Sequence, residues 1–476
     1  MPLANYKLEP LSPEQIEAVH QAGVKILAET GVVFDSPRAL EIFSRHGVKA
    51  DGKVVFIPEK LLEQALASAP STYTHHARND QHNVITGHGR RKLALSSSYG
   101  PVNILDPVEG RRPGRLSDYA DLIKLSQALD IVNMVGGLPV EPSDADPARK
   151  NLQMLRLALR HTDKAVWGFS STPEDIAKMF RLLEIAMGLD GDRLWGNPVI
   201  AAPVCPLSPL KYADIAAETI VSYAARRQPL YINSCILAGA SGPVSLMGTV
   251  TLMNAEILAG LTLAQLAGPG TPVAYVPGST VADMRGGTYV CGSPESALIV
   301  AAGIQLAAQR YRLPVRVMAG ISDAKAVDYQ AGVETMQNMF TAVLAGAHYL
   351  NNALGNLEGQ MTTSLAKFVL DAETVGRLVR LMDGFSGADA DLSVDLIMSE
   401  GHKGNYLSHP STLAGFRSRW RPGLSSWADW NRWQVLKISG IDQLADRRAK
   451  EILAAAPEKM IDDSTDRDLS KFVEKA

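Results

Sequence analysis

Eight repeats of one pattern run from Leu93 to about Leu381. Each repeat is a short apolar run typical of a strand, a turn rich in Gly, Pro, Ser or Asn, and an amphipathic stretch typical of a helix. The apolar runs begin about 31 to 43 residues apart, which is the length of one βα unit. Eight such units close a parallel barrel, so the pattern predicts an α/β fold, a (β/α)8 TIM barrel. The expected strands are Leu93–Ser97, Val132–Gly136, Lys164–Phe169, Val199–Ala202, Leu230–Ser234, Pro272–Val276, Val315–Ala319 and His348–Asn352.

Two segments flank the predicted barrel of residues 91–384. Residues 1–90 are expected to form a small α+β extension, whose first helix begins with Ser12 as cap and Gln15 closing a capping box. Residues 385–476 are expected to be helical and to pack on the barrel, because no low-complexity linker separates them from it. The expected flanking elements are helices at 13–29, 37–45, 58–67, 391–400, 427–437 and 440–455 and a strand at 54–57.

Composition limits the class of protein, its binding partners and its location. The chain has 476 residues, of which 46% are hydrophobic, enough to bury a large core. Its formal net charge of -3 gives no electrostatic reason to expect nucleic acid or a membrane surface as a partner. We expect neither a secretion signal nor a membrane span, because no apolar stretch of 18 residues is unbroken and the first residues carry no charged segment followed by an apolar one. Three cysteines, Cys205, Cys235 and Cys291, cannot build a disulfide framework, which favours the cytoplasm.

The residues at the carboxyl ends of the expected strands are mostly aromatic or small and polar, with few cations. Barrels of this kind place their chemistry at these ends. Aromatic faces attract a quaternary ammonium, so the residues favour a small ligand with a positive charge. The alternative is that Trp167, Phe169 and Tyr275 fill the barrel or pack beneath its loops. The segments concerned are 96–100, 167–170, 203–206, 233–235, 275–279, 320–325 and 348–352.

A series of motifs follows in order along the second half of the chain. They lie at Gly242–Leu246, Asn254–Glu256, Gly292–Glu295, Ser322–Lys325, Asp328–Glu334, Lys367–Glu373, Gly404–Leu407 with His409, and Arg417–Pro422. In these motifs the chain resembles the trimethylamine methyltransferase family, and the resemblance extends over about residues 10 to 455. The founding members of that family carry pyrrolysine in the barrel and demethylate trimethylamine. This chain has no such residue and reads Gly320-Ile321-Ser322-Asp323 at strand seven.

The resemblance to the pyrrolysine-free branch implies a corrinoid-dependent methyltransferase of class EC 2.1.1. Such enzymes move a methyl group from a quaternary amine to the cob(I)alamin of a corrinoid protein. Glycine betaine is the favoured substrate, with carnitine, proline betaine, butyrobetaine or another methylamine left open. A quaternary nitrogen already carries its charge and leaves as a neutral amine, so the protein has to place the methyl group and exclude water. The cobalamin is expected on a partner protein, with none bound permanently, and the enzyme is expected to be a homo-oligomer.

Eight residues are the candidate site residues on this basis. Asp323 and His348 are the candidate catalytic residues, and the candidate substrate-binding residues are Tyr99, Trp167, Phe169, Asn233, Tyr275 and Asn351. The aromatic residues are expected to face the methylammonium, and the Asn and His side chains to bind a carboxylate. A lone His or Asn at a strand end is also often satisfied by the backbone. Asp323 could instead cap a helix and pair with Lys325.

Other functions remain open from the residues alone. Cys205, Cys235 and His348 could form a three-ligand zinc set, but zinc activates thiols and alcohols, so we expect no metal and read the cysteines as small packing residues. Asp80-Gln81-His82 is followed by Ile85 where a cobalamin-binding motif requires Gly. A metal-dependent barrel enzyme and a betaine-binding barrel without activity are the two remaining classes. Trp420, Trp427, Trp430 and Trp433 are either an oligomer interface or packing between helices.

Overall fold

The computed structural model describes residues 7–89, 93–189, 196–385, 387–435 and 440–476, and its centre is a ring of eight parallel strands. One sheet has the order β15-β13-β11-β10-β9 and another the order β18-β19-β6. Parallel bridges from Ser96 to Met134 and from Tyr275 to Val315 join the two sheets at both edges, which closes the ring. The strands are β6 (Ala94–Leu95), β9 (Met134–Gly136), β10 (Ala165–Trp167), β11 (Ile200–Val204), β13 (Leu230–Ser234), β15 (Val273–Pro277), β18 (Arg316–Met318) and β19 (Tyr349–Asn351).

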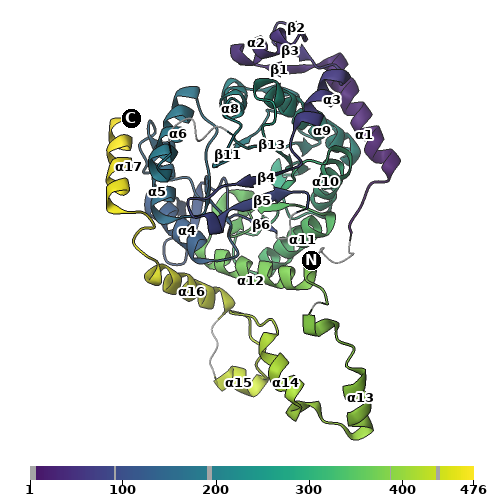
Figure 1. The fold of residues 1–476 in the computed structure, drawn as a ribbon, viewed down its shortest axis with the longest axis vertical. Helices are drawn as coiled ribbons and strands as arrows, with labels where there is room; N and C mark the ends of the chain where they lie inside the picture. The colour runs from purple at the N-terminus through teal and green to yellow at the C-terminus, as the bar shows by residue number, and fades with distance from the viewer. Residues whose placement is uncertain (1–6, 90–92, 190–195, 386, 436–439) are drawn as a thin grey trace.

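A helix follows each of these strands, and the helices form a ring outside the strands (Figure 1). Each of the eight apolar runs expected from the sequence overlaps one strand, with β11 and β15 extending past the expected ends, so the barrel prediction is confirmed. The helices are α4 (Leu116–Ala128), α5 (Lys150–His161), α6 (Pro173–Met187), α8 (Asp214–Ala224), α9 (Leu246–Ala267), α10 (Pro294–Gln305), α11 (Tyr329–Ala345) and α12 (Leu365–Met382).

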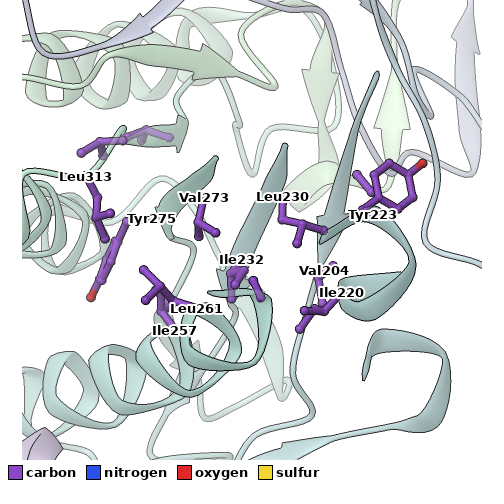
Figure 2. Packing of buried hydrophobic residues seen from close by; sticks show 14 of the residues in the cluster. Val204, Ile220, Tyr223, Leu230, Ile232, Ile257, Leu261, Val273, Tyr275 and Leu313 are labelled. Carbon is purple, nitrogen blue, oxygen red and sulfur yellow. The ribbon is translucent and has the colours of Figure 1, made fainter. Parts of the chain in front are cut away.

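The strands divide their side chains between two cores, because successive residues of a strand point to opposite faces. Trp167, Tyr231 and Tyr349 belong to a cluster inside the ring, together with small residues such as Ala201 and Ala274. The alternate residues belong to a larger cluster between strands and helices, part of which Figure 2 shows. Both faces of every strand are therefore buried, as is usual in a parallel barrel.

Helix α9 is long and apolar enough to cross a membrane by length and composition alone, with a mean hydropathy of 1.4 over its best window. In this structure 78% of that window is buried. The helix packs on β13 and β15 on one side and contacts α1 (Pro13–Lys25) and α3 (Glu59–Ser68) on another. These contacts explain its composition, because a helix that is apolar all round belongs in the core of a large protein.

The N-terminal extension follows the expected order of elements. Ser12 caps α1, and Gln15 completes the capping box. The helix continues as a short π-helical turn to Thr30, and a four-stranded sheet of order β12-β1-β3-β2 follows. Because β12 comes from the barrel segment after β11, this sheet joins the extension to the barrel. The remaining elements are β1 (Val32–Phe34), α2 (Pro37–Arg45), β2 (Lys49–Asp51), β3 (Val54–Phe56) and β12 (Lys211–Tyr212).

A hairpin that the sequence did not predict crosses the amino ends of the barrel strands (Figure 1). It consists of β4 (Thr72–His75) and β5 (Val84–Gly87). The His76 N–H donates to the carbonyl of Pro198, just before β11, at 2.7 Å. The Tyr73 hydroxyl lies 3.0 Å from that of Tyr231 inside the ring. The hairpin therefore closes the end of the barrel opposite to the expected site.

His75 makes the stability of this closed end depend on pH. Its side chain is fully buried, and burial lowers the pKa of the imidazole to about 4, from an ordinary 6.5. The unfolded chain therefore binds more protons than the folded one between these pH values, so stability falls as the pH drops from 6.5 to 4. We expect His75 alone to remove about 3 kcal/mol by pH 4. Urea unfolding across this range measures the effect.

The His75→Gln variant is expected to lose this share of the pH dependence. The pKa of His161 is also lowered to about 4, so His161 makes stability depend on pH in the same direction. The His75→Gln variant retains this second contribution. His46→Gln is the control, because His46 is exposed on the surface. Equal pH profiles for His75→Gln and the wild type would show that His75 is not buried as a neutral group.

The C-terminal residues divide into two parts. Helix α16 (Ile441–Ala455) packs on α12 and α4, and α17 (Asp463–Lys475), which was not predicted, packs on α5 and α6. Between them and the barrel, α13 (Val394–Glu400), α14 (Pro410–Gly415) and α15 (Trp430–Val435) extend away from it (Figure 1). This arm departs from the expectation that the whole extension packs on the barrel. Residues 436–437 of the expected helix lie outside the described residues.

The arm touches the barrel at its base. Glu373 of α12 accepts hydrogen bonds from the N–H groups of Leu424 and Ser425, and Arg377 lies over the ring of Trp420 at 4.7 Å. Farther out the side chains are exposed. Of the four tryptophans, Trp427 and Trp430 are about two-thirds exposed, and Trp433 stacks on Trp430.

Candidate functional site

The carboxyl ends of the eight strands form the barrel mouth, where four of the predicted site residues come together. Trp167 ends β10, and the ring of Tyr99 lies 5.4 Å from it. Asn233 precedes the last residue of β13, and its amide nitrogen lies 3.6 Å from the Cys205 sulfur. Asn351 ends β19, beside Ser96. The structure thus brings aromatic rings and neutral amides into one region of the mouth.

A residue that the sequence analysis did not select lies at the centre of this group. Arg316, the first residue of β18, points into the barrel and is 2% exposed. Its guanidinium lies 4.6 Å from the Trp167 ring and 5.6 Å from the Tyr231 ring. With the Asn351 amide turned so that its nitrogen donates to Ser96, the amide oxygen accepts from Nη2 of Arg316. Two rings and one amide therefore fix the orientation of a buried cation.

The remaining nitrogens of Arg316 have no partner. Nε and Nη1 are buried without a hydrogen bond, and no carboxylate pairs with Arg316 among the residues that the structure describes. Burial lowers the pKa of the guanidinium, but arginine keeps its charge in proteins. A buried cation without an anion is costly, so this region of the mouth requires a negative charge.

Arg316 changes the role that Trp167 can have. The sequence predicts that Trp167 faces a methylammonium, but its ring already lies against the guanidinium. Its indole N–H donates to the Tyr349 hydroxyl at 2.7 Å inside the barrel. Trp167 is therefore barrel filling that supports Arg316, which is the alternative that the sequence left open. Tyr99, which is only partly buried, retains a position at the mouth from which its ring can meet a ligand.

Two cysteines meet at the mouth. Cys205 follows β11 and Cys235 follows β13, and Cys205 is an exposed residue. Their mutual hydrogen bond holds the pKa of the Cys205 thiol below its usual value and raises that of Cys235. Arg316 and Asn233 also favour the Cys205 thiolate. The charge of Arg316 therefore acts on Cys205, an exposed residue of the mouth.

Three predicted site residues lie elsewhere. Tyr275 points outward from β15, donates to the Asn254 amide oxygen at 3.2 Å, and belongs to the core beneath the helices (Figure 2). Phe169 is buried in the same outer core. His348 precedes β19, so it lies at the amino end of the barrel, where its Nδ1 accepts from the Val315 N–H at 3.0 Å. None of these three side chains joins the group of Tyr99, Trp167, Asn233 and Asn351 at the mouth.

The positions of these residues also show whether Cys205, Cys235 and His348 can form a zinc site. His348 lies at the opposite end of the barrel from Cys205 and Cys235, so the three-ligand set does not form. In the described part of the chain no cluster of three His, Cys, Asp or Glu side chains could hold a metal ion. His82, in the segment weighed as a cobalamin motif, bonds to Asp163 at 2.9 Å.

Asp323 lies at the rim, beside a cavity of about 670 Å³ between the β16–β17 hairpin and the strand-seven loop. The hairpin consists of β16 (Thr280–Asp283) and β17 (Thr288–Val290). The Asp323 carboxylate accepts from the N–H groups of Cys291, at 2.9 and 3.1 Å, and Gly292, at 2.8 Å. Lys325 donates to the carbonyl of Asp323, and Asp328 caps α11. Asp323 therefore neither caps the helix nor pairs its carboxylate with Lys325, but joins two rim loops.

The Asp323→Asn variant is expected to loosen the rim. An amide cannot accept all the bonds that the carboxylate accepts, and hydrogen bonds to a charged group contribute about 1.5–3 kcal/mol. We expect a stability loss in this range and faster amide hydrogen exchange at Cys291 and Gly292. Asp328→Asn is the matched control, because Asn caps a helix as well as Asp does. Unchanged exchange at both amides would contradict the positioning role.

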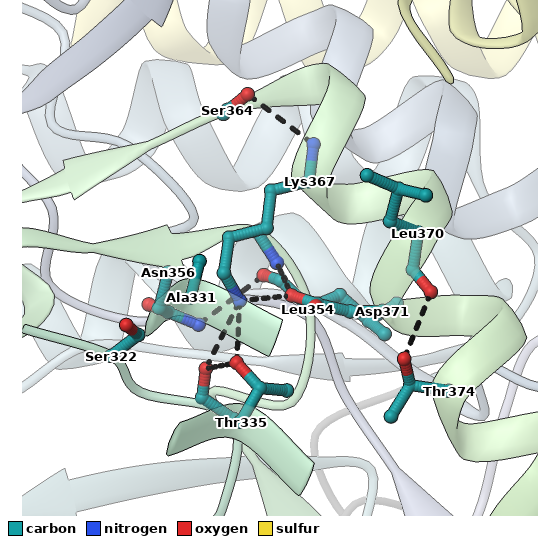
Figure 3. A network of polar contacts seen from close by, with 12 residues as sticks. Ser322, Ala331, Thr335, Leu354, Asn356, Ser364, Lys367, Leu370, Asp371 and Thr374 are labelled. Atoms are coloured by element: carbon teal, nitrogen blue, oxygen red, sulfur yellow. Dashed lines mark hydrogen bonds and ion pairs between the residues drawn. The ribbon is translucent and has the colours of Figure 1, made fainter. Parts of the chain in front are cut away.

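A buried ion pair supports the strand-seven side of the mouth (Figure 3). Lys367 of α12 donates to Asp371 at 2.6 Å and to Thr335 of α11 at 2.8 Å. Asp371 also accepts from the N–H of Gly355, in the loop after β19, at 2.8 Å. Burial raises the pKa of Asp371, while Lys367 opposes this shift. The pair connects two helices with the loop beyond strand eight.

The comparisons with known proteins agree over the whole chain. The model of the family described as trimethylamine methyltransferase (MTTB) matches residues 3–476. A glycine betaine methyltransferase of Desulfitobacterium hafniense is 34% identical over 98% of this chain and 97% of its own length. A proline betaine:corrinoid methyltransferase of Eubacterium limosum is 31% identical over 93% and 92%.

A solved structure supports the fold. The monomethylamine methyltransferase of Methanosarcina barkeri covers 94% of this chain and 90% of its own, with a TM-score of 0.52 and 14% identity. The match of the family model over nearly every residue agrees with the closed barrel and with the motifs on strands five to eight. The chain therefore belongs to the trimethylamine methyltransferase family.

Proposed function

We propose that this protein transfers a methyl group from a quaternary amine, with glycine betaine as the favoured substrate, to the cob(I)alamin of a corrinoid protein. The observation that carries the proposal is the 34% identity to a glycine betaine methyltransferase over nearly the full length of both chains. The proline betaine relative supports the same class of substrate. The absence of pyrrolysine from the sequence favours a quaternary amine over trimethylamine.

The proposed reaction needs little acid–base catalysis from the protein. Cob(I)alamin supplies the electron pair for the new bond to the methyl carbon, and the electrons of the broken C–N bond stay on nitrogen. A neutral tertiary amine leaves without a proton. The residues of the mouth then have to position the ammonium and exclude water. Tyr99 and the neutral amide of Asn233 fit this task, and neither of them has to donate a proton to nitrogen.

The corrinoid is expected to arrive on a separate protein that meets the barrel mouth. The loops at the rim, fixed by Asp323, are the surface that such a partner would approach first. We also place the protein in the cytoplasm, in agreement with its three free cysteines. A homo-oligomer is part of the same proposal, supported by the exposed tryptophans of the arm.

The test is methyl transfer from a panel of amines to added cob(I)alamin, followed by the absorbance of methylcobalamin. We expect transfer from glycine betaine, with one dimethylglycine formed per methyl group. The rates of transfer from proline betaine, carnitine and butyrobetaine rank these alternative substrates. Dimethylglycine, a tertiary amine, is the negative control. No transfer from any quaternary amine would overturn the proposal. Tight binding of a betaine without transfer would identify a binding protein instead.

A further inference from the structure

We propose that Arg316 binds the carboxylate of the substrate, so that the barrel mouth selects zwitterionic betaines over quaternary amines that are only cations. This inference deepens the proposed function and rests on it for the identity of the reaction. It adds a binding residue and a substrate class that carries both a positive and a negative charge.

Arg316 brings a positive charge into the interior of the barrel. Arg316 is almost completely buried, and no described carboxylate pairs with it. An anion with good geometry offsets the desolvation of a cation most strongly. A quaternary amine without a carboxylate would place a second positive charge near the first. A betaine instead brings its own counter-ion.

Arg316 also carries hydrogen-bond donors that have no acceptor. Nε and Nη1 of Arg316 are buried without acceptors, although buried donors in native proteins are nearly always satisfied. A carboxylate is the acceptor that a guanidinium binds most strongly. The rings of Trp167 and Tyr231 and the Asn351 amide hold the group in place before a ligand arrives. The site is therefore preorganised for an anion.

The direction of the Arg316 side chain also favours a ligand at the mouth. In the strand register Arg316 lies beside Tyr349, but its guanidinium contacts Asn351, two residues nearer the carboxyl end. Two residues of a strand advance about 6–7 Å. The side chain thus extends toward the mouth, where its charge helps to lower the pKa of the exposed residue Cys205. This direction brings the guanidinium closer to a ligand at the mouth than the strand position alone would.

The same region offers a partner for the other end of a betaine. The amide oxygen of Asn233 is buried without a hydrogen bond. The methyl groups of an ammonium carry partial positive charge and can donate weak C–H···O contacts to such an oxygen. The partly buried ring of Tyr99 adds an aromatic surface. One part of the mouth therefore suits the carboxylate and another the methylammonium.

The experiment measures ligand binding by calorimetry on the full-length protein without the corrinoid partner. Glycine betaine is compared with its methyl ester and with tetramethylammonium, which both lack the carboxylate charge. We expect the wild type to bind glycine betaine at least about tenfold more tightly than either. In Arg316→Gln this preference is expected to disappear, and Arg316→Lys should keep part of it. Arg310→Gln is the matched control, because Arg310 pairs with Glu17 and Glu63 outside the barrel.

Each outcome decides the proposal. Equal binding of glycine betaine and its ester to the wild type would overturn it, whether or not the variants fold. So would an Arg316→Gln protein that is folded by circular dichroism and retains the wild-type preference. A Cys205→Ser variant tests whether the Cys205 thiolate is the counter-ion of the ammonium instead. If the wild type binds tetramethylammonium at least tenfold more tightly than this variant does, the proposal is also overturned. A charge-selective wild type that transfers no methyl group would refute the proposed function but not the carboxylate site.

Discussion

Replacement of Lys367 by Met is expected to lower the free energy of unfolding by about 3–5 kcal/mol. The substitution leaves the Asp371 carboxylate buried without its cation, and Thr335 loses its donor. The carboxyl group is then expected to take up a proton, since burial already raises its pKa. Chemical unfolding at pH 7 measures the loss, and unfolding at lower pH should show a smaller difference from the wild type.

The helix α16 supplies a matched control for this prediction. Lys450 pairs with Asp446 four residues away, as Lys367 does with Asp371, but the Lys450 side chain is 62% exposed. Lys450→Met should change stability by no more than about 0.5 kcal/mol. The double variant Lys367→Met with Asp371→Leu should recover part of the loss, although the Gly355 N–H then lacks its acceptor. A Lys367→Met protein as stable as Lys450→Met would contradict the buried ion pair.

Replacement of Trp167 by Ala is expected to have an effect of similar size, about 3–5 kcal/mol. The indole fills the inside of the ring of strands, and its removal leaves a cavity that the barrel cannot close. It also deprives the Tyr349 hydroxyl of a donor and the Arg316 guanidinium of a ring to lie against. Urea unfolding measures the stability.

Two variants separate these contributions. Trp167→Phe keeps a ring beside Arg316 but loses the hydrogen bond to Tyr349, so we expect a loss of about 1–2 kcal/mol. Trp430→Ala, in the exposed arm, should cost no more than about 0.5 kcal/mol. A Trp167→Ala variant within 1 kcal/mol of the wild type (about fivefold in the folding equilibrium) would show that this side chain is not barrel filling.

The eight strands could be predicted because their spacing is regular and each apolar run is short. The side-chain direction within each strand could not, since both faces of a parallel strand are buried and both are apolar. Tyr275 illustrates this. It points outward, and its neighbours Ala274 and Val276 point inward, although the run Val273–Pro277 is apolar throughout.

His348 and Arg316 were misjudged for different reasons. His348 begins its predicted strand, so chain direction alone would have placed it at the amino end of the barrel. Arg316 was not predicted because it lies inside an apolar run, Val315–Ala319, away from the strand ends where site residues were expected. A lone charged residue within a buried strand was the signal. Asp323 lies at the rim, and its expected part in catalysis stays a prediction.

The hairpin of β4 and β5 has a kinetic consequence. Because it covers the amino end of the barrel, a ligand in the interior has to enter and leave by the opposite end. Under the proposed function, the corrinoid partner covers that same end during methyl transfer. The amine must then bind before the partner, and the demethylated amine can leave only after the partner dissociates. Steady-state kinetics should therefore follow a compulsory order of addition and release.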